Sequence, residues 1–493
     1  MNLAVALGNS IRKEGSKTAV FWGDDHYSYD HFGRQAAWLA SHLISKWGLQ
    51  PGDRVGLWLK NRPEFISALL GVLEASGVAV PINNFLKAEE VKHILTDAGI
   101  KVLLSEQAMD ESLLSLTRDL PGLGTFHIEE MPPSEGLPMA FVGESKRLSA
   151  DLAVIIYTSG TTGKPKGAML SHGNLLHNVE SCRQVLEAVQ VDRFAVLLPM
   201  FHSFMLCVGI LLPLSVGGSI VMIRSLHPPK NILHEIQRHG ATILPAIPQL
   251  FRALSTAFEG QELPLRVCIS GAAPLPAEIR REFATTFGIP LIEGYGLSEA
   301  SPVVSLNPIR GPWKEGSIGI PIPDVEVSIQ DDSGQILPCG TAGEICVRGG
   351  NVMLGYWNKP EETAKSMRGD WLLTGDIGYQ DEEGYLFITD RKKDMLLVNG
   401  INVYPREIEE VLYQMSAIKE GAVIGRPDSR RGEQPIAFAV LNQGAHATER
   451  EIIDFLRAKL ADYKVPRHVH FLNSLPRNAT GKVLKTELRA LHP

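Results

Sequence analysis

The segment Tyr157-Thr-Ser-Gly-Thr-Thr-Gly-Lys-Pro-Lys-Gly167 decides the fold. It follows the apolar run Leu152–Tyr157 and precedes apolar residues at helical spacing. Its glycines allow the backbone to approach a phosphate closely, its hydroxyls can donate hydrogen bonds, and its two lysines supply positive charge. Pro165 stands where a Walker P-loop has Ser or Thr after Gly-Lys. We therefore predict a phosphate-binding loop of a different kind, placed between a strand and a helix.

Apolar runs alternate with helical stretches on both sides of this loop. From Asp151 to Gly294 the apolar runs lack the period-2 pattern of half-exposed strands. Fully apolar strands separated by helices predict a parallel sheet that is covered on both faces. The first 150 residues have the same character. The predicted strands of both regions are Arg54–Leu59, Lys101–Ser105, Leu152–Tyr157, Phe194–Leu198, Ser219–Ile223, Thr242–Ala246, Arg266–Ser270 and Pro290–Ile292.

The pattern changes after about Ser317. Alternating runs with Gly-containing turns between them predict antiparallel hairpins. The charged cluster Asp390–Asp394 indicates a domain boundary, and a stretch of mixed helices and strands follows it. The predicted fold class is therefore α/β, with a large N-terminal domain at residues 1–389 and a small α+β lid domain at residues 390–493. We expect the large domain to contain doubly wound sheets and a β-rich subdomain.

Composition excludes several other classes of protein. With 44% hydrophobic and 21% charged residues in 493, the chain is neither disordered nor fibrous. Its 48 Lys and Arg against 55 Asp and Glu give a net charge of −7, so we expect no nucleic-acid partner. The five cysteines are an odd number and form no C-x-x-C pair. Without a visible export signal, these features predict a reducing, cytoplasmic location.

One uncharged stretch, Phe204–Ile223, is long enough for a membrane-spanning helix. Pro213 and the pair Gly217-Gly218 divide it into a helix and a buried strand. We therefore expect no transmembrane span. A peripheral contact with a membrane stays open, and the sequence does not determine the oligomeric state.

Five further segments follow the phosphate loop in chain order. They are Ser270-Gly-Ala-Ala-Pro274, Glu293-Gly-Tyr-Gly-Leu-Ser-Glu299, Thr374-Gly-Asp376, Asp390-Arg-Lys-Lys393 and Pro476-Arg-Asn-Ala-Thr-Gly-Lys482. Together with the loop they resemble the adenylate-forming, or AMP-binding, superfamily of acyl-CoA synthetases, peptide-synthetase adenylation domains and beetle luciferases. Within it, Tyr295–Pro302 and Asn402–Glu409 are most similar to bacterial fatty-acyl-CoA synthetases.

The resemblance implies a reaction in two steps, with ATP, Mg²⁺ and coenzyme A as cofactor or co-substrates. A carboxylate first attacks the α-phosphate of ATP, giving an acyl-adenylate and pyrophosphate. The thiol of coenzyme A then attacks the acyl carbon. Because two anions meet in the first step, catalysis must consist mostly of positioning and charge neutralisation.

The resemblance also assigns roles to individual residues. Glu299 would hold Mg²⁺, and Lys482 would reach the carboxylate and the phosphate from the small domain, because an ammonium is a compact charge with three donors. Lys393 would be the hinge, and Gly400 would let the pantetheine arm pass. The residues expected to contact the nucleotide or coenzyme A are Thr158, Ser159, Gly160, Thr161, Thr162, Gly163, Lys166, Gly271, Ala272, Ala273, Glu293, Gly294, Tyr295, Gly296, Ser298, Asp376, Arg391, Lys393 and Gly400.

Tyr295 offers a flat face for adenine, and Asp376 can accept hydrogen bonds from both ribose hydroxyls. The glycines on either side of Tyr295 favour an exposed ring on a tight loop at the end of a strand. Some aryl-CoA ligases have lysines where this chain has Leu397 and Asn399, so the way in which the coenzyme A phosphates are held stays open.

His202, in Pro199-Met-Phe-His-Ser203, bears on the substrate class. Amino-acid-activating relatives typically have an aspartate near this segment to pair with the substrate ammonium, and this chain has none there. In acyl-CoA synthetases the resemblance places a histidine at this position beside the acyl pocket. We therefore expect a carboxylic acid without an α-amine, and apolar neighbours such as Phe201, Phe204 and Val303 suit an apolar tail.

The sequence analysis thus favours a fatty-acyl-CoA synthetase for medium or long chains. An aryl or other small-acid CoA ligase is an alternative, and so is an enzyme that loads a carrier-protein thiol, although we expect no fused carrier domain in the short tail after Lys482. A nucleotide- and lipid-binding regulator without catalysis is a further class. The joint presence of Glu299, Asp376, Arg391 and Lys482 argues against it.

Overall fold

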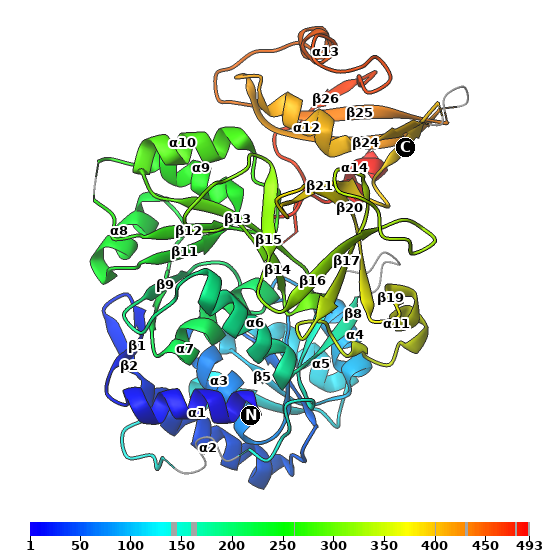
Figure 1. The fold of residues 1–493 in the computed structure, drawn as a ribbon. Helices are drawn as coiled ribbons and strands as arrows, with labels where there is room; N and C mark the ends of the chain where they lie inside the picture. The colour runs from blue at the N-terminus through cyan, green and yellow to red at the C-terminus, as the bar shows by residue number, and fades with distance from the viewer. Residues whose placement is uncertain are drawn as a thin grey trace.

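The computed structural model describes residues 1–139, 145–158, 165–260, 262–399, 401–428, 432–478 and 481–491. Within these ranges the strands form three sheets. Two of them make up the lower, larger part of the molecule in Figure 1, and the third lies above them with the C-terminal helices. The predicted α/β class is therefore confirmed.

The longest sheet joins a parallel half to an antiparallel half. Its parallel strands run from β1 to β13, and β14 continues it as the first of the antiparallel strands that the alternating sequence predicts. In spatial order the strands are β16 (Val325–Gln330), β17 (Gly343–Gly349), β20 (Trp371–Gln380), β21 (Leu386–Arg391), β15 (Ser317–Pro321), β14 (Val303–Leu306), β13 (Leu291–Gly296), β12 (Val267–Ser270), β11 (Ile243–Ala246), β9 (Arg193–Val196), β10 (Ser219–Met222), β1 (Thr18–Trp22) and β2 (Asp25–Ser28), with β19 (Met367–Arg368) beside β20.

The second sheet carries the phosphate loop. Its strands β7, β4, β3, β5 and β6 are parallel, and the edge formed by β8 and β18 is antiparallel. The spatial order is β18 (Gly355–Tyr356), β8 (Lys166–Ser171), β7 (Leu152–Thr158), β4 (Val78–Pro81), β3 (Arg54–Trp58), β5 (Ile100–Ser105) and β6 (Gly124–His127).

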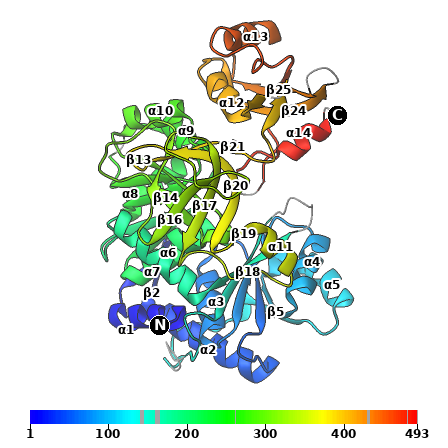
Figure 2. The same ribbon diagram turned by 45° about the vertical axis from the view of Figure 1, so that its right-hand side comes forward.

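The third sheet belongs to the C-terminal part of the chain. Its strands are β23 (Ile401–Val403), β22 (Leu396–Val398), β25 (Gly432–Leu441) and β24 (Ile418–Asp428), with β26 (Val469–Phe471) parallel to β25. One face packs on two helices, α12 (Pro405–Tyr413) and α13 (Glu449–Arg457), and the other on α14 (Lys485–Leu491). Figure 2 shows this part set above the two larger sheets, joined to them at the end of β21.

Helices cover the two larger sheets. They are α1 (Leu3–Glu14), α2 (Tyr29–Trp47), α3 (Pro63–Glu74), α4 (Ala88–Ala98), α5 (Asp110–Asp119), α6 (His172–Val185), α7 (Leu212–Val216), α8 (Lys230–His239), α9 (Pro248–Ala257), α10 (Ala277–Phe287) and α11 (Pro360–Ser366). Short 3₁₀ turns lie at Gln107–Met109, Ile128–Glu130 and Ser298–Ala300, and a π-helix at Met205–Leu211.

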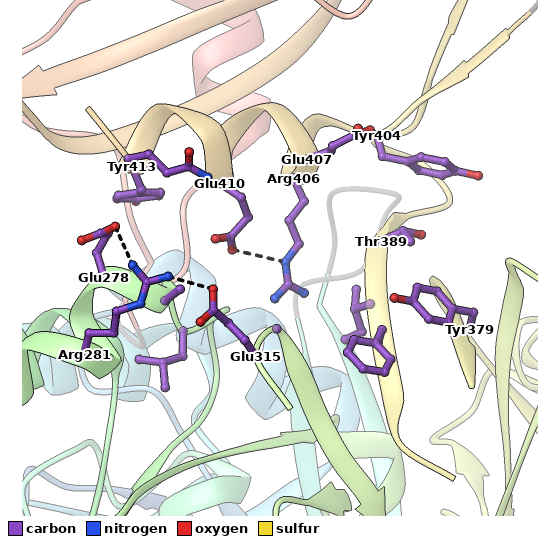
Figure 3. Close-up of a pocket in the computed structure, with 16 residues that line it drawn as sticks. Glu278, Arg281, Glu315, Tyr379, Thr389, Tyr404, Arg406, Glu407, Glu410 and Tyr413 are labelled. Carbon is purple, nitrogen blue, oxygen red and sulfur yellow. Dashed lines mark hydrogen bonds and ion pairs between the residues drawn. The ribbon is translucent and has the colours of Figure 1, made fainter. Parts of the chain in front are cut away.

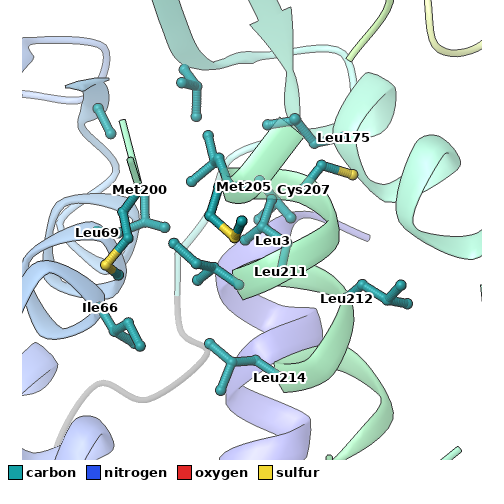
Figure 4. Close-up of a cluster of buried hydrophobic side chains, with 14 of the residues drawn as sticks. Leu3, Ile66, Leu69, Leu175, Met200, Met205, Cys207, Leu211, Leu212 and Leu214 are labelled. Atoms are coloured by element: carbon teal, nitrogen blue, oxygen red, sulfur yellow. The ribbon is translucent and has the colours of Figure 1, made fainter. Parts of the chain in front are cut away.

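The largest hydrophobic core lies between the two larger sheets and contains side chains of α1, α2, α3 and α6. The π-helix Met205–Leu211 crosses this core with every residue buried. Figure 4 shows Met205, Leu211 and Leu212 packed among Leu3, Leu69 and Leu175. Such burial explains why the stretch Phe204–Ile223 has no charges, since the protein interior here is as apolar as a membrane. Among the described residues, no helix is both long enough and apolar enough to cross a bilayer.

Candidate active site

The phosphate loop connects two antiparallel strands. Thr158 at the end of β7 pairs with Lys166 at the start of β8, and the intervening residues 159–164 lie outside the described ranges. The predictions for Ser159, Gly160, Thr161, Thr162 and Gly163 therefore cannot be placed. The expected strand-to-helix loop is wrong, because β8 comes before α6. The apolar run that follows Lys166 pairs along the whole of β7 and forms a hairpin.

Glu299 lies in the 3₁₀ turn that follows β13. Its Oε1 accepts hydrogen bonds from the Tyr356 hydroxyl at 2.8 Å and from the Thr158 hydroxyl at 3.5 Å. Burial and the Glu299 carboxylate raise the pKa of Tyr356, so the phenol stays a proton donor. Within the described part of the chain, Oε2 of Glu299 accepts no hydrogen bond. One oriented carboxylate with a free oxygen suits Mg²⁺, which usually takes one or two carboxylates together with phosphate oxygens.

Lys166 is held by groups that the sequence analysis did not identify. Its ammonium pairs with the carboxylate of Glu362 on α11, and it lies 5.3 Å from the centre of the Tyr356 ring. Tyr356 therefore touches both Lys166 and Glu299. Nothing in the sequence singles out Tyr356 or Glu362, because they follow Lys166 by almost 200 residues and belong to no recognised motif.

Tyr295, Asp376 and Arg391 form a connected group. The Tyr295 hydroxyl donates to Asp376 Oδ2 at 2.6 Å, and Arg391 Nε lies 3.1 Å from Asp376 Oδ1. Asp376 and Arg391 are direct partners on β20 and β21. Tyr295 lies near the C-terminal end of β13, as predicted, but it is paired with Ser305 of β14 and is not on a loop. Its ring is nevertheless partly exposed, since the pleat alternates sides and Gly296 follows it.

Lys482 lies close to this group although it comes from the end of the chain. Burial lowers the pKa of Lys482 to about 8. The positive charges of Arg391 and Lys393 also lower this pKa, whereas the negative charges of Asp376 and Asp394 raise it. Its turn is closed by the Lys482 amide, which donates to the Asn478 side chain at 2.9 Å. The charges of Asp376 and Arg391 thus act on Lys482, and its contact with nucleotide and substrate stays a prediction.

Two glycines of the site are required by close packing. A Cβ on Gly296 would overlap the carbonyl oxygen of Pro302, so the backbone of β13 can bend there only without a side chain. A Cβ on Gly271 would lie 3.2 Å from the Phe204 ring. Ala272 next to it has φ of 65°, the left-handed region. We expect the segment that holds Gly271, Ala272 and Ala273 to be fixed in shape before any ligand binds.

Glu293 and Gly294 occupy the interior side of this segment. Glu293 is buried, and its Oε1 accepts a hydrogen bond from the Leu275 amide at 3.0 Å. A Cβ on Gly294 would lie 2.6 Å from Leu306. The Glu293 carboxylate thus supports the Ser270–Leu275 segment. Its second neighbour is Arg406 of α12, at 4.0 Å.

His202 stands at the entrance to the π-helix. Burial lowers the pKa of His202 to about 4, so the imidazole is neutral at pH 7. Its Nδ1 accepts from the Phe204 amide at 3.3 Å, and the neighbouring Ser203 hydroxyl lies 2.9 Å from that of Ser298. Ser298 directly precedes Glu299, so the His202 segment and the proposed metal position are adjacent. Phe85, which the sequence analysis did not single out, places its exposed ring near Phe201.

Lys393 acts on this group through its charge, which helps to lower the pKa of Lys482. Gly400 lies outside the described residues. Lys393 is exposed in the turn between β21 and β22, where Lys392 and Asp394 donate backbone hydrogen bonds and Lys393 does not. The described residues contain no cluster of three or more His, Cys, Asp or Glu side chains that could hold a metal by themselves.

The fold and the site define an enzyme that forms acyl-adenylates. Residues 7–357 match the family model of the AMP-binding enzyme, and residues 407–482 match that of the AMP-binding enzyme C-terminal domain. The chain belongs to the AMP-binding enzyme family and is an acid–CoA ligase of that family.

Relatives within the family carry different names. The chain is 36% identical to a long-chain-fatty-acid–CoA ligase of Bacillus subtilis, over 98% of this chain and 93% of that protein. It is 35% identical to a feruloyl-CoA synthase of Amycolatopsis, over 96% and 95%. ATP-bound MatB from Rhodopseudomonas palustris superposes with a TM-score of 0.92 at 33% identity, over 100% and 99%. Apo MatB superposes with a TM-score of 0.80 at 32% identity, over the same shares.

Proposed function

We propose that this acid–CoA ligase acts on a fatty acid of medium or long chain. The observation that carries the proposal is the neutral, apolar segment Phe201–Phe204 beside the Glu299 turn. It has no carboxylate to pair with a substrate ammonium, and His202 carries no charge at pH 7. Burying an unpaired ammonium there would be costly, whereas an apolar tail would lose little. The similarity to the Bacillus subtilis ligase supports the same choice.

The residues that meet in the site suggest how the first step proceeds. The Tyr295 ring would stack on adenine, and Asp376 would exchange its bonds to Tyr295 and Arg391 for ribose hydroxyls. Mg²⁺ bound at Glu299 would neutralise charge on the phosphates. Lys482 would bring its ammonium to the substrate carboxylate and the α-phosphate, so that two anions can approach each other.

We further propose that residues 1–389 and 390–493 act as two domains with a hinge at Lys393. The sheet of the larger part ends at Arg391, and the small sheet begins at Leu396. Domain rotation would withdraw Lys482 after adenylation and admit the thiol of coenzyme A to the same acyl carbon. Gly400 would then let the pantetheine arm pass.

The test is a panel of carboxylic acids with pyrophosphate detection, run with and without coenzyme A. The panel includes fatty acids from about four to sixteen carbons, benzoate, ferulate and several α-amino acids. We expect the highest kcat/KM for an unsubstituted fatty acid of eight or more carbons, with turnover that depends on coenzyme A. An α-amino acid as the best substrate would refute the substrate class.

An aryl acid is the second candidate. It is favoured by the exposed ring of Phe85 beside Phe201, on which an aromatic acid could stack. The similarity to feruloyl-CoA synthase supports it as well. The same panel separates the two, because a pocket of this second kind would prefer ferulate or benzoate over every fatty acid.

A further inference from the structure

A cavity of about 680 Å³ separates the C-terminal part of the chain from the rest of the molecule. Figure 3 shows α12 above it, with Arg406 and Glu410 pointing down, and Glu278, Arg281 and Glu315 below. Its remaining walls come from β20 and β21. Because both parts of the molecule line the cavity, its shape depends on their relative orientation. The contacts across it therefore help to decide which orientation is stable.

Arg406 is the residue that crosses this interface beside the cavity. It lies in the first turn of α12, and its side chain is 11% exposed. Its Nη2 is 4.0 Å from Glu293 Oε1, and its Nε is 3.9 Å from Glu410 Oε1. Glu293 belongs to β13 of the longest sheet, whereas Glu410 is on the same helix as Arg406. A rotation of the small domain would separate Arg406 from Glu293 and leave it beside Glu410.

The charge of Arg406 stabilises the ionised form of Glu293, so separating the two residues favours protonation of that carboxyl group. Burial raises the pKa of Glu293 to about 7, and Arg406 is the first of the groups that oppose this shift. A buried carboxylate that loses its cation must either take up a proton or pay a desolvation penalty. Removing one partner of a buried pair is therefore much more destabilising than removing a solvent-exposed one.

The position of Lys482 indicates which domain orientation contains the ion pair between Arg406 and Glu293. In the same arrangement Lys482 lies near Asp376 and Arg391, and a Cβ on Gly481 would lie 2.6 Å from Ile247 of the larger part. The whole chain also superposes better on ATP-bound MatB than on apo MatB, with TM-scores of 0.92 and 0.80. Both observations agree with an arrangement suited to adenylation.

We propose that the Arg406–Glu293 ion pair stabilises the domain orientation in which the acyl-adenylate forms, and that it breaks before the thioester forms. This inference rests on the proposed two-step function. Arg406 and Glu293 are positioning residues in it, because they act through the placement of Lys482 and touch no reacting atom. Lys392 in the hinge turn also pairs with Glu344 of the longest sheet at 3.1 Å, but it lies at the pivot, whereas Arg406 lies on α12.

The experiment measures the two half-reactions separately. The first is acid-dependent pyrophosphate release, and the second is conversion of supplied acyl-adenylate to the thioester. We expect Arg406→Met and Glu293→Gln to slow the first about tenfold or more and to slow the second much less. The amide of Glu293→Gln can still accept from Leu275, so this variant removes the charge and keeps the hydrogen bond.

Glu410→Gln is the matched control. Its carboxylate lies at nearly the same distance from the same guanidinium but moves with it, so the ratio of the two half-reactions should not change. Arg406→Lys keeps a cation and should recover part of the first half-reaction. If thermal unfolding shows that Arg406→Met does not fold, Arg406→Lys and Glu293→Gln decide the question.

Equal losses in both half-reactions would overturn the inference, and so would a Glu410→Gln variant that shifts their ratio as strongly as Glu293→Gln does. In either case, an active wild-type enzyme would leave the proposed function standing. A wild-type enzyme that releases no pyrophosphate with any acid of the panel would refute the proposed function and the inference together.

Discussion

Lys482 is a cation whose charge depends on pH close to the working range. Its pKa of about 8 in the structure means that the ammonium is present below that pH and is lost as pH rises through it. Because adenylation would need the charge, we expect kcat/KM for pyrophosphate release to fall above about pH 8. Lys482→Arg should lower the rate but remove this decline, because a guanidinium stays charged. A decline of the same shape in Lys482→Arg would assign it to another group.

Glu299 and Tyr356 should differ in how much they contribute to the rate of adenylation. If Glu299 binds Mg²⁺, Glu299→Ala should slow adenylation by about 10²–10³-fold. Tyr356→Phe removes only the hydroxyl that orients Glu299 Oε1, so the expected loss is about tenfold, mainly through weaker binding of Mg²⁺. Pyrophosphate release measured over a Mg²⁺ titration checks both variants. Unchanged activity of Glu299→Ala at limiting Mg²⁺ would contradict the metal assignment.

At the scale of elements, the turn between β21 and β22 should act as a hinge. The amide of Lys393 donates no backbone hydrogen bond within the described residues, so a proline there would remove none. Proline fixes φ near −65° and would prevent the backbone rotation that a hinge requires. We expect Lys393→Pro to retain acyl-adenylate formation and suppress thioester formation. Lys482→Ala should give the reverse pattern, and parallel losses in both variants would refute domain alternation.

The elements also show what the sequence could predict. Strands β5 and β10 each differ from their predicted ranges by only one residue at one end, because their apolar runs are unambiguous. Strand β8 was missed, since its short apolar run after a Gly-rich loop has no pattern of its own. Tyr356, Glu362 and Arg406 were missed for a different reason: each is defined by a partner far along the chain, and pairing across sheets leaves no periodic signal.

At the scale of the whole molecule, the site should couple the two parts of the chain when they unfold. A non-hydrolysable acyl-adenylate analogue would contact Tyr295 and Asp376 on one side and Lys482 on the other. At about 100 times its Kd it should stabilise the folded protein by about 2.7 kcal/mol. Calorimetry should show that the transitions of both parts shift upward together. A shift confined to one transition would mean that the ligand contacts one part alone.

The cavity between α12 and α10 has a pharmacological consequence. A small molecule that fills it would bind one domain orientation and hardly the other, so its binding free energy would shift the equilibrium towards that orientation. Such a compound would leave the ATP and acid sites open and would trap the enzyme with its adenylate still bound. Raising the concentration of acid or ATP would not overcome this inhibition, because neither competes for the space beside Arg406 and Glu410. Coenzyme A would oppose it, because coenzyme A would bind the other domain orientation.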